Sequence, residues 1–134
     1  MAVGNSAYDE ILVAIPGLIC DSSLNTSDSA NYHMRFVKMT ANLTVGLAGA
    51  SDPVIGVLLN KPTTGHAVTV AGAGSVCKVY CNDTISAGAL ISPDASGYAV
   101  NATSGRYEPA LALDGGSAGD RITVLVLGGM DKKA

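Results

Sequence analysis

The stretch Arg121-Ile122-Thr123-Val124-Leu125-Val126-Leu127 decides the fold class of this 134-residue chain. Four of its seven side chains are β-branched, and such side chains suit the pleated surface of a sheet. It is the strongest strand prediction in the sequence, and the predicted strand covers Asp120–Leu127.

Upstream of this strand, short apolar segments alternate with turn residues. Sixteen Gly and five Pro divide the chain into pieces that favour short strands over long helices. Met34–Thr40 alternates, with Met34 and Phe36 opposite Arg35 and Lys38, and is predicted as the first core strand. Pro93-Asp94-Ala95-Ser96-Gly97 has strong hairpin-turn chemistry. The other predicted strands are 44–47, 54–59, 67–71, 75–81, 89–92, 98–101 and 110–113.

A weak internal echo occurs at an offset of 54 residues (56 + 54 = 110). Gly56-Val57-Leu58-Leu59-Asn60 falls on Ala110-Leu111-Ala112-Leu113-Asp114, and Val68-Thr69-Val70 falls on Ile122-Thr123-Val124. Gly65 falls on Gly119. A true duplication and two unrelated β-hairpins explain the echo equally well. Both predict an all-β fold, a small single-domain barrel or sandwich of short strands.

Residues 1–33 differ in character from the rest. Ser6 with Asp9 could cap a helix that ends before Pro16, whereas the β-branched alternation of Ile11, Val13 and Ile15 favours an extended arm. A Ser-, Asn- and Asp-rich stretch over 21–31 reads as an exposed loop. The predicted organisation is an N-terminal arm and polar loop over 1–33, followed by a β-barrel-like domain over 34–134.

Composition bounds the function. The net charge is −3, charged residues make up only 14%, and the eight basic residues are scattered, which argues against a nucleic-acid partner. The apolar run 11–20 is too short to span a membrane and has no basic residues before it, so a cytoplasmic origin is expected. So few surface charges suggest that copies of this chain or another protein cover much of the surface.

No pattern of catalytic or ligand-binding residues is found. His33 and His66 are interpreted as surface histidines, and no spacing matches a phosphate loop, a nucleophile elbow or a calcium loop. Cys77 and Cys81 on one strand would lie about 13 Å apart, too far for a disulfide. With Cys20 they are predicted to be reduced thiols. The sequence thus predicts no enzyme, no metal and no cofactor.

Several segments between residues 34 and 129 occur in a fixed order. They are Phe36-Val37-Lys38, Val45-Gly46-Leu47-Ala48-Gly49-Ala50, Asp52-Pro53-Val54-Ile55-Gly56-Val57-Leu58, Asn60-Lys61-Pro62, Gly65, Ile85-Ser86-Ala87-Gly88-Ala89-Leu90-Ile91, Asp94-Ala95-Ser96-Gly97, Ala99-Val100, Ala110-Leu111-Ala112-Leu113, Ala118-Gly119-Asp120 and Ile122-Thr123-Val124-Leu125-Val126-Leu127. Their order resembles that in the small capsid decoration (cement) proteins of tailed bacteriophages. The resemblance covers about residues 34–129 and implies a β-barrel-like domain on the outer surface of a phage virion, made in the host cytoplasm. It implies the major capsid protein and further copies of the chain, as a trimer, as partners, with neither catalysis nor a cofactor.

The N-terminal arm is the candidate interface. Its apolar side chains would fill pockets on a neighbouring subunit or on the shell, or the segment would complete its own barrel. An alternative function is another virion structural module, a tail or fibre domain that binds a host surface ligand, although sugar sites usually use aromatic faces and the chain has no Trp. The candidate interface residues are Tyr8, Ile11, Leu12, Val13, Ile15 and Leu18.

Overall fold

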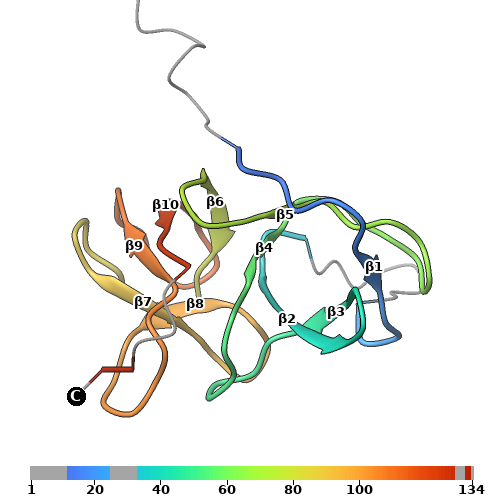
Figure 1. Ribbon diagram of the computed structural model, residues 1–134. Helices are drawn as coiled ribbons and strands as arrows, with labels where there is room; N and C mark the ends of the chain where they lie inside the picture. Colours follow the sequence, from blue (N-terminus) through green and yellow to red (C-terminus); the bar gives the residue numbers. More distant parts are fainter. Residues whose placement is uncertain (1–11, 25–32, 129–131, 134) are drawn as a thin grey trace, which may run out of the picture.

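The computed structural model describes residues 12–24, 33–128, 132 and 133. Its ten strands form two five-stranded sheets that lie side by side as two lobes (Figure 1). No helix occurs among the described residues, and the predicted all-β class is confirmed. The strands are β1 (Ile19–Cys20), β2 (Phe36–Ala41), β3 (Thr44–Leu47), β4 (Gly56–Leu58), β5 (Val70–Ala71), β6 (Val76–Tyr80), β7 (Leu90–Pro93), β8 (Ala99–Asn101), β9 (Ala110–Ala112) and β10 (Arg121–Val126).

Each lobe is one sheet rolled toward a closed barrel. In lobe 1 (β1–β5) the strand order is β1-β3-β2-β4-β5, and a bridge from Ile19 to Ala67 brings β1 next to the segment that leads into β5. In lobe 2 (β6–β10) the order is β6-β10-β9-β7-β8, and a parallel bridge from Cys81 to Ala99 joins the two outer strands. Rolling up leaves little unpaired strand edge in either lobe.

The two lobes are structural repeats. The hairpin of lobe 1 pairs Val57 with Ala71. Adding 54 to both numbers gives Leu111 and Leu125, which are paired in lobe 2. Likewise, β2 pairs with β4 through Phe36 and Val57, and β7 pairs with β9 through Leu90 and Leu111. Of the two explanations of the sequence echo, the structure therefore supports duplication.

The hairpin turns repeat in detail. In lobe 1, Leu59 N donates to Thr69 O at 2.8 Å, and in lobe 2, Leu113 N donates to Thr123 O at 2.8 Å. Thr69 N donates to the Asn60 side chain at 3.0 Å, and Thr123 N donates to the Asp114 side chain at 2.7 Å. Gly65 and Gly119, which the echo aligned, both have positive φ.

Strands β1 and β6 are also equivalent, but they are separated by a different number of residues. Cys20 N donates to His66 O at 3.1 Å, and Cys81 N donates to Asp120 O at 2.9 Å. The two thiols also donate to equivalent carbonyls, Cys20 Sγ to Thr63 O at 2.7 Å and Cys81 Sγ to Ser117 O at 3.1 Å. Cys20 and Cys81 are 61 residues apart (81 − 20 = 61), seven more than the offset of the later strands (61 − 54 = 7).

Equivalent side chains fill the interior of each lobe. Lobe 1 encloses Leu18, Cys20, Val37, Val45, Leu58, Val68 and Val70. The equivalent positions in lobe 2 are Val79, Cys81, Ile91, Ala99, Ala112, Ile122 and Val124. Because aliphatic side chains fill both interiors, the fold needs no large aromatic core. Cys20, Cys77 and Cys81 are buried thiols that form no disulfide with one another, as predicted.

A second packing layer lies between the lobes. Phe36, Val57 and Ala71 point out of lobe 1 and are 0% exposed, because they pack in one cluster with lobe 2 residues that include Ala110 and Val126. The core strand predicted at Met34–Thr40 forms as β2, and both of its faces are buried at its start. Phe36 contacts lobe 2 while Val37 fills lobe 1, so both faces of β2 are covered there.

Candidate interaction surfaces

The described part of the predicted arm is extended and is attached to lobe 1. Val13 N donates to Ser75 Oγ at 2.8 Å and its carbonyl accepts from Gly72 N at 2.8 Å. Ile15 N donates to Val70 O at 3.2 Å. Residues 12–15 thus run beside β5, where the backbone hydrogen bonds satisfy a sheet edge.

The candidate interface residues fall into different environments. Leu12 and Val13 are 46% and 50% exposed, Ile15 is half-buried, and Leu18 is 4% exposed inside lobe 1. Tyr8 and Ile11 lie outside the described residues. Among the described members of the set, Leu12 and Val13 are therefore the side chains that present most apolar surface to a partner. The domain boundary at residues 33 and 34 stays a prediction, although Leu18, Cys20 and Leu24 pack into lobe 1.

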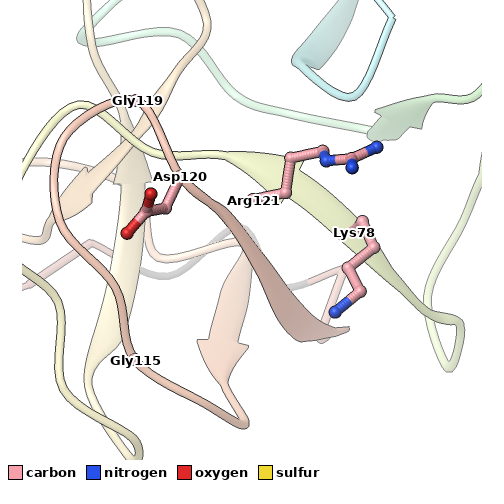
Figure 2. Close-up of a pocket in the computed structure, with 5 residues that line it drawn as sticks. All are labelled: Lys78, Gly115, Gly119, Asp120 and Arg121. Carbon is pink, nitrogen blue, oxygen red and sulfur yellow. The ribbon is translucent and has the colours of Figure 1, made fainter.

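A shallow polar hollow lies at the β6–β10 side of lobe 2 and is lined by Lys78, Gly115, Gly119, Asp120 and Arg121. Figure 2 shows the Asp120 carboxylate turned away from the charged ends of Lys78 and Arg121. Asp120 accepts a hydrogen bond from Ser117 N at 2.8 Å, which explains it as a loop-forming residue. The charged groups do not converge on one point, so the hollow lacks the arrangement that catalysis requires.

The carboxylates whose pKa values are shifted also make hydrogen bonds within the loops. A hydrogen bond from Lys38 and a second one from Gly49 lower the pKa of Asp52, whose carboxylate accepts from Lys38 Nζ and Gly49 N, each at 2.7 Å. Hydrogen bonds from the backbone and side chain of Asn101 lower the pKa of Asp83. Burial raises the pKa of Asp21, but hydrogen bonds from Ser23 and Thr40 and the charge of Lys38 together outweigh it, and the net shift is downward. Each shift has a structural cause, and none indicates a general acid or base.

The two histidines are placed apart from each other. His33 lies edge-on to the Tyr80 ring, with centroids 5.9 Å apart, and burial together with nearby Lys61, Arg121 and Arg35 lowers its pKa. His66 is exposed and its Nδ1 contacts the hydroxyl of Thr63. Within the described residues no three His, Cys, Asp or Glu side chains are grouped as a metal site would require. The same residues contain no helix long and apolar enough to cross a bilayer.

Comparisons with known proteins give a match at the level of structure. No family model and no curated protein matches the chain. The fold is similar to the N base of head fibre gp8.5 of bacteriophage phi29, with a TM-score of 0.61 and 12% sequence identity. The match covers 89% of this chain and 95% of that chain. At this identity the likeness shows that the two chains share a fold, with both lobes included in the matched length.

Proposed function

We propose that this chain is a structural protein of a phage virion that decorates the outer surface of a capsid shell as a trimer. The observation that carries the proposal is the likeness to the phi29 head fibre base over 89% of the chain. The sequence resemblance to phage decoration proteins supports the same class of protein from independent features. Because many proteins can share one fold, the assignment depends on a binding experiment.

The surface is consistent with this role. The described residues offer exposed apolar side chains, including Leu12, Leu43 and Leu113, in a chain of which only 14% is charged. Where exposed apolar side chains gather in one patch, they mark a site at which proteins associate. A trimer would present three copies of each weak contact to the shell, and linked contacts increase the overall affinity by orders of magnitude.

The experiment that tests the proposal is co-sedimentation of the purified chain with matching undecorated shells, with bound copies counted per major capsid subunit. Saturation at a fixed ratio that fits trimers at three-fold positions is the expected result. Absence of binding, with the purified chain monomeric, would overturn the decoration role.

The N-terminal segment is proposed as the contact to the shell, with Leu12 and Val13 as its described anchors. The double variant Leu12→Asp, Val13→Asp should bind shells at least about tenfold more weakly, because each apolar contact would bury a charge. The matched control is Thr103→Asp, Ser104→Asp, which places two carboxylates at exposed turn residues of lobe 2. Equal binding by the two double variants would exclude this segment as the anchor.

The second candidate function is a fibre or tail module that binds a host surface ligand. The phi29 neighbour favours it, because that protein is the base of a head fibre. Binding to host cell envelopes without binding to shells would select this function. Binding to shells at a stoichiometric ratio would select decoration.

A further inference from the structure

The exposed large apolar side chains of the described residues fall into three groups. Leu12 and Val13 belong to the N-terminal segment discussed above. Of the others, one group lies on lobe 2 and the other on lobe 1. The lobe 2 group is Leu90, Leu113 and Leu127, and the lobe 1 group is Ile19, Met39 and Leu43.

The lobe 2 group is part of a continuous apolar row. Val76 pairs with Leu125, Leu125 with Leu111, and Leu111 with Leu90, so four side chains stand side by side across four neighbouring strands. Their neighbours along the strands, such as Val124 and Ile91, are buried inside the lobe, and the row therefore points outward. We call this surface the leucine face, which comprises Val76, Leu90, Leu111, Leu113, Leu125 and Leu127.

The surface of lobe 1 that is equivalent to the leucine face is buried against lobe 2. The positions in lobe 1 equivalent to Leu90, Leu111 and Leu125 are 54 residues earlier, Phe36, Val57 and Ala71. All three are 0% exposed because lobe 2 packs over them. In lobe 2, Leu90 is 42% exposed, while Leu111 and Leu125 are half-buried. The same face is thus an interface in lobe 1, whereas in lobe 2 no lobe formed by the described residues covers it.

The repeat also identifies the surface that would cover it. Lobe 2 contacts lobe 1 partly through the backbone of Tyr80 and Gly97. Tyr80 N donates a hydrogen bond to Met34 O, and Phe36 N donates one to Gly97 O, each at 2.9 Å. The equivalent residues in lobe 1 are Ile19 and Leu43.

Ile19 and Leu43 are apolar and 40% and 63% exposed. Met39, 43% exposed, is equivalent to the buried Pro93. We call Ile19, Met39 and Leu43 the lobe 1 patch.

We propose that the leucine face of one copy docks against the lobe 1 patch of a second copy. This contact continues between copies the lobe-to-lobe packing that exists within one chain. It joins two different surfaces, and contacts of this type close into rings when the rotation between copies allows it. The inference rests on the self-association in the proposed function and names the surfaces that would hold the trimer together.

The test uses the full chain in three forms, wild type, Leu90→Glu and Leu43→Glu, with molar mass measured by sedimentation velocity and light scattering. Both positions are more than 40% exposed, so the lobes should still fold, and the circular dichroism spectrum checks this. Each variant should be mainly monomeric where the wild type is trimeric, with the dissociation constant raised at least about tenfold, because the contact would bury a carboxylate. Ser104→Glu, in an exposed turn of lobe 2, is the control and should stay trimeric.

Mixing the two variants tests the pairing of the surfaces. Leu43→Glu keeps an intact leucine face and Leu90→Glu keeps an intact lobe 1 patch, so the mixture should form a one-to-one dimer that neither variant forms alone. A wild-type monomer would overturn the inference, as would a trimeric Leu90→Glu or Leu43→Glu. Two monomeric variants that do not combine would exclude the head-to-tail pairing.

Shell binding separates this inference from the proposed function. A chain that forms the trimer through these surfaces but does not co-sediment with shells keeps the inference and overturns decoration. A chain that binds shells at saturation while both variants remain trimeric keeps decoration and overturns the inference.

Discussion

Lobe 1 and lobe 2 are nearly the same inside and different outside. Val37, Val45 and Leu58 in lobe 1 correspond to Ile91, Ala99 and Ala112 in lobe 2, and all six side chains are buried. On the outer face, Phe36 of lobe 1 is 0% exposed while its counterpart Leu90 is 42% exposed. The interior of a small rolled sheet accepts only small apolar side chains of suitable volume, here aliphatic groups and the thiols of Cys20 and Cys81. The outer face can diverge together with the surface that packs on it.

Each repeat thus contains the same packing surface in a different environment, buried in lobe 1 and partly exposed in lobe 2. Within the chain lobe 2 is the partner of lobe 1, and Gly97 allows the approach, since a Cβ there would lie 2.7 Å from Leu47 Cδ1 and 3.0 Å from Phe36 O. Pairs of equivalent positions therefore make matched experiments, in which one lobe is the control for the other.

The largest expected difference is between Phe36→Ala and Leu90→Ala. Phe36→Ala should lower the free energy of unfolding by about 3–5 kcal/mol, because it leaves a cavity between the lobes. Leu90→Ala should cost about 1 kcal/mol, because the side chain is partly exposed. Urea unfolding measures both at a protein concentration where the wild type is monomeric, since association through Leu90 would otherwise add to its cost. Equal losses would contradict the different burial of the two faces.

The next effect concerns the turns at Gly97 and Leu43, which are equivalent and have φ of 77° and 49°. Gly97→Ala should cost about 2 kcal/mol or more, from left-handed strain plus the close contacts described above. Gly105→Ala is the control, because Gly105 has φ of 84° but no atom within 4 Å of the added Cβ, and it should cost only about 1 kcal/mol.

The reverse change, Leu43→Gly, removes strain at the corresponding turn of lobe 1 and should gain up to about 1 kcal/mol. Because Leu43 also belongs to the proposed lobe 1 patch, the comparison is made at a protein concentration where the wild type is monomeric. Thermal unfolding should then order the melting temperatures as Leu43→Gly, wild type, Gly105→Ala and Gly97→Ala, from highest to lowest. A higher melting temperature for Gly97→Ala than for Gly105→Ala would show that the lobes do not approach closely at this turn.

A smaller effect is expected at Asn60 and Asp114, which accept the hydrogen bonds of Thr69 N and Thr123 N. Asn60→Ala and Asp114→Ala should each cost about 1 kcal/mol, the usual net value of one such bond. The Lys78–Asp114 ion pair at 4.0 Å is exposed and should add little, so salt should change the Asp114 result only slightly. Losses that differ severalfold would show that the two turns are not energetically equivalent.

The smallest expected effect is a change in stability with pH. It arises because equivalent hydrogen-bond acceptors in the two lobes differ in whether they titrate. Asp83 accepts from Asn101 N in lobe 2, whereas at the equivalent place in lobe 1 Leu47 N donates to the hydroxyl of Ser23, which does not titrate. The hydrogen bonds from Asn101 lower the pKa of Asp83 below its ordinary value of 3.8. A carboxyl whose pKa is lower in the folded state stabilises the fold above pH 3.8 and loses this contribution as the pH falls through the folded value.

Asp83→Asn should therefore flatten the decline of stability below about pH 4, as measured by urea unfolding from pH 7 to pH 3. Asp21 and Asp52, whose pKa values are also lowered, should keep part of the decline in the variant. An acid profile that Asp83→Asn leaves unchanged would remove Asp83 from the set of acid-sensitive contacts.

Local sequence pattern predicted most of the strands. Each predicted strand from Met34 onward overlaps one that forms, and the Pro93–Gly97 turn lies where its chemistry placed it, with Gly97 N donating to Asp94 O at 3.1 Å. The strand at Ile19–Cys20 was not predicted as such. Its equivalence to β6 is hidden because the spacing between Cys20 and β2 is longer by seven residues (16 − 9 = 7) than that between Cys81 and β7.

The candidate interaction surfaces could be predicted from the sequence less well than the strands. Ile15 and Leu18 resemble Leu12 and Val13 in the sequence, yet Leu18 fills lobe 1 while Val13 is half exposed. The hydrophobicity of a residue does not predict which segment of the fold will pack over its side chain. The leucine face is hidden for the same reason: the echo aligns Leu111 with Val57, but the sequence does not indicate that one is covered and the other is partly exposed.

Local propensity and spacing along the chain specify the all-β class, the strand segments, the turns and the outline of a repeat. The packing of distant segments adds a fifth strand from the N-terminal segment to the repeat. It also buries one outer face while its equivalent stays exposed. Burial depends on which distant segments meet in space, and two copies of one local pattern cannot encode that difference alone.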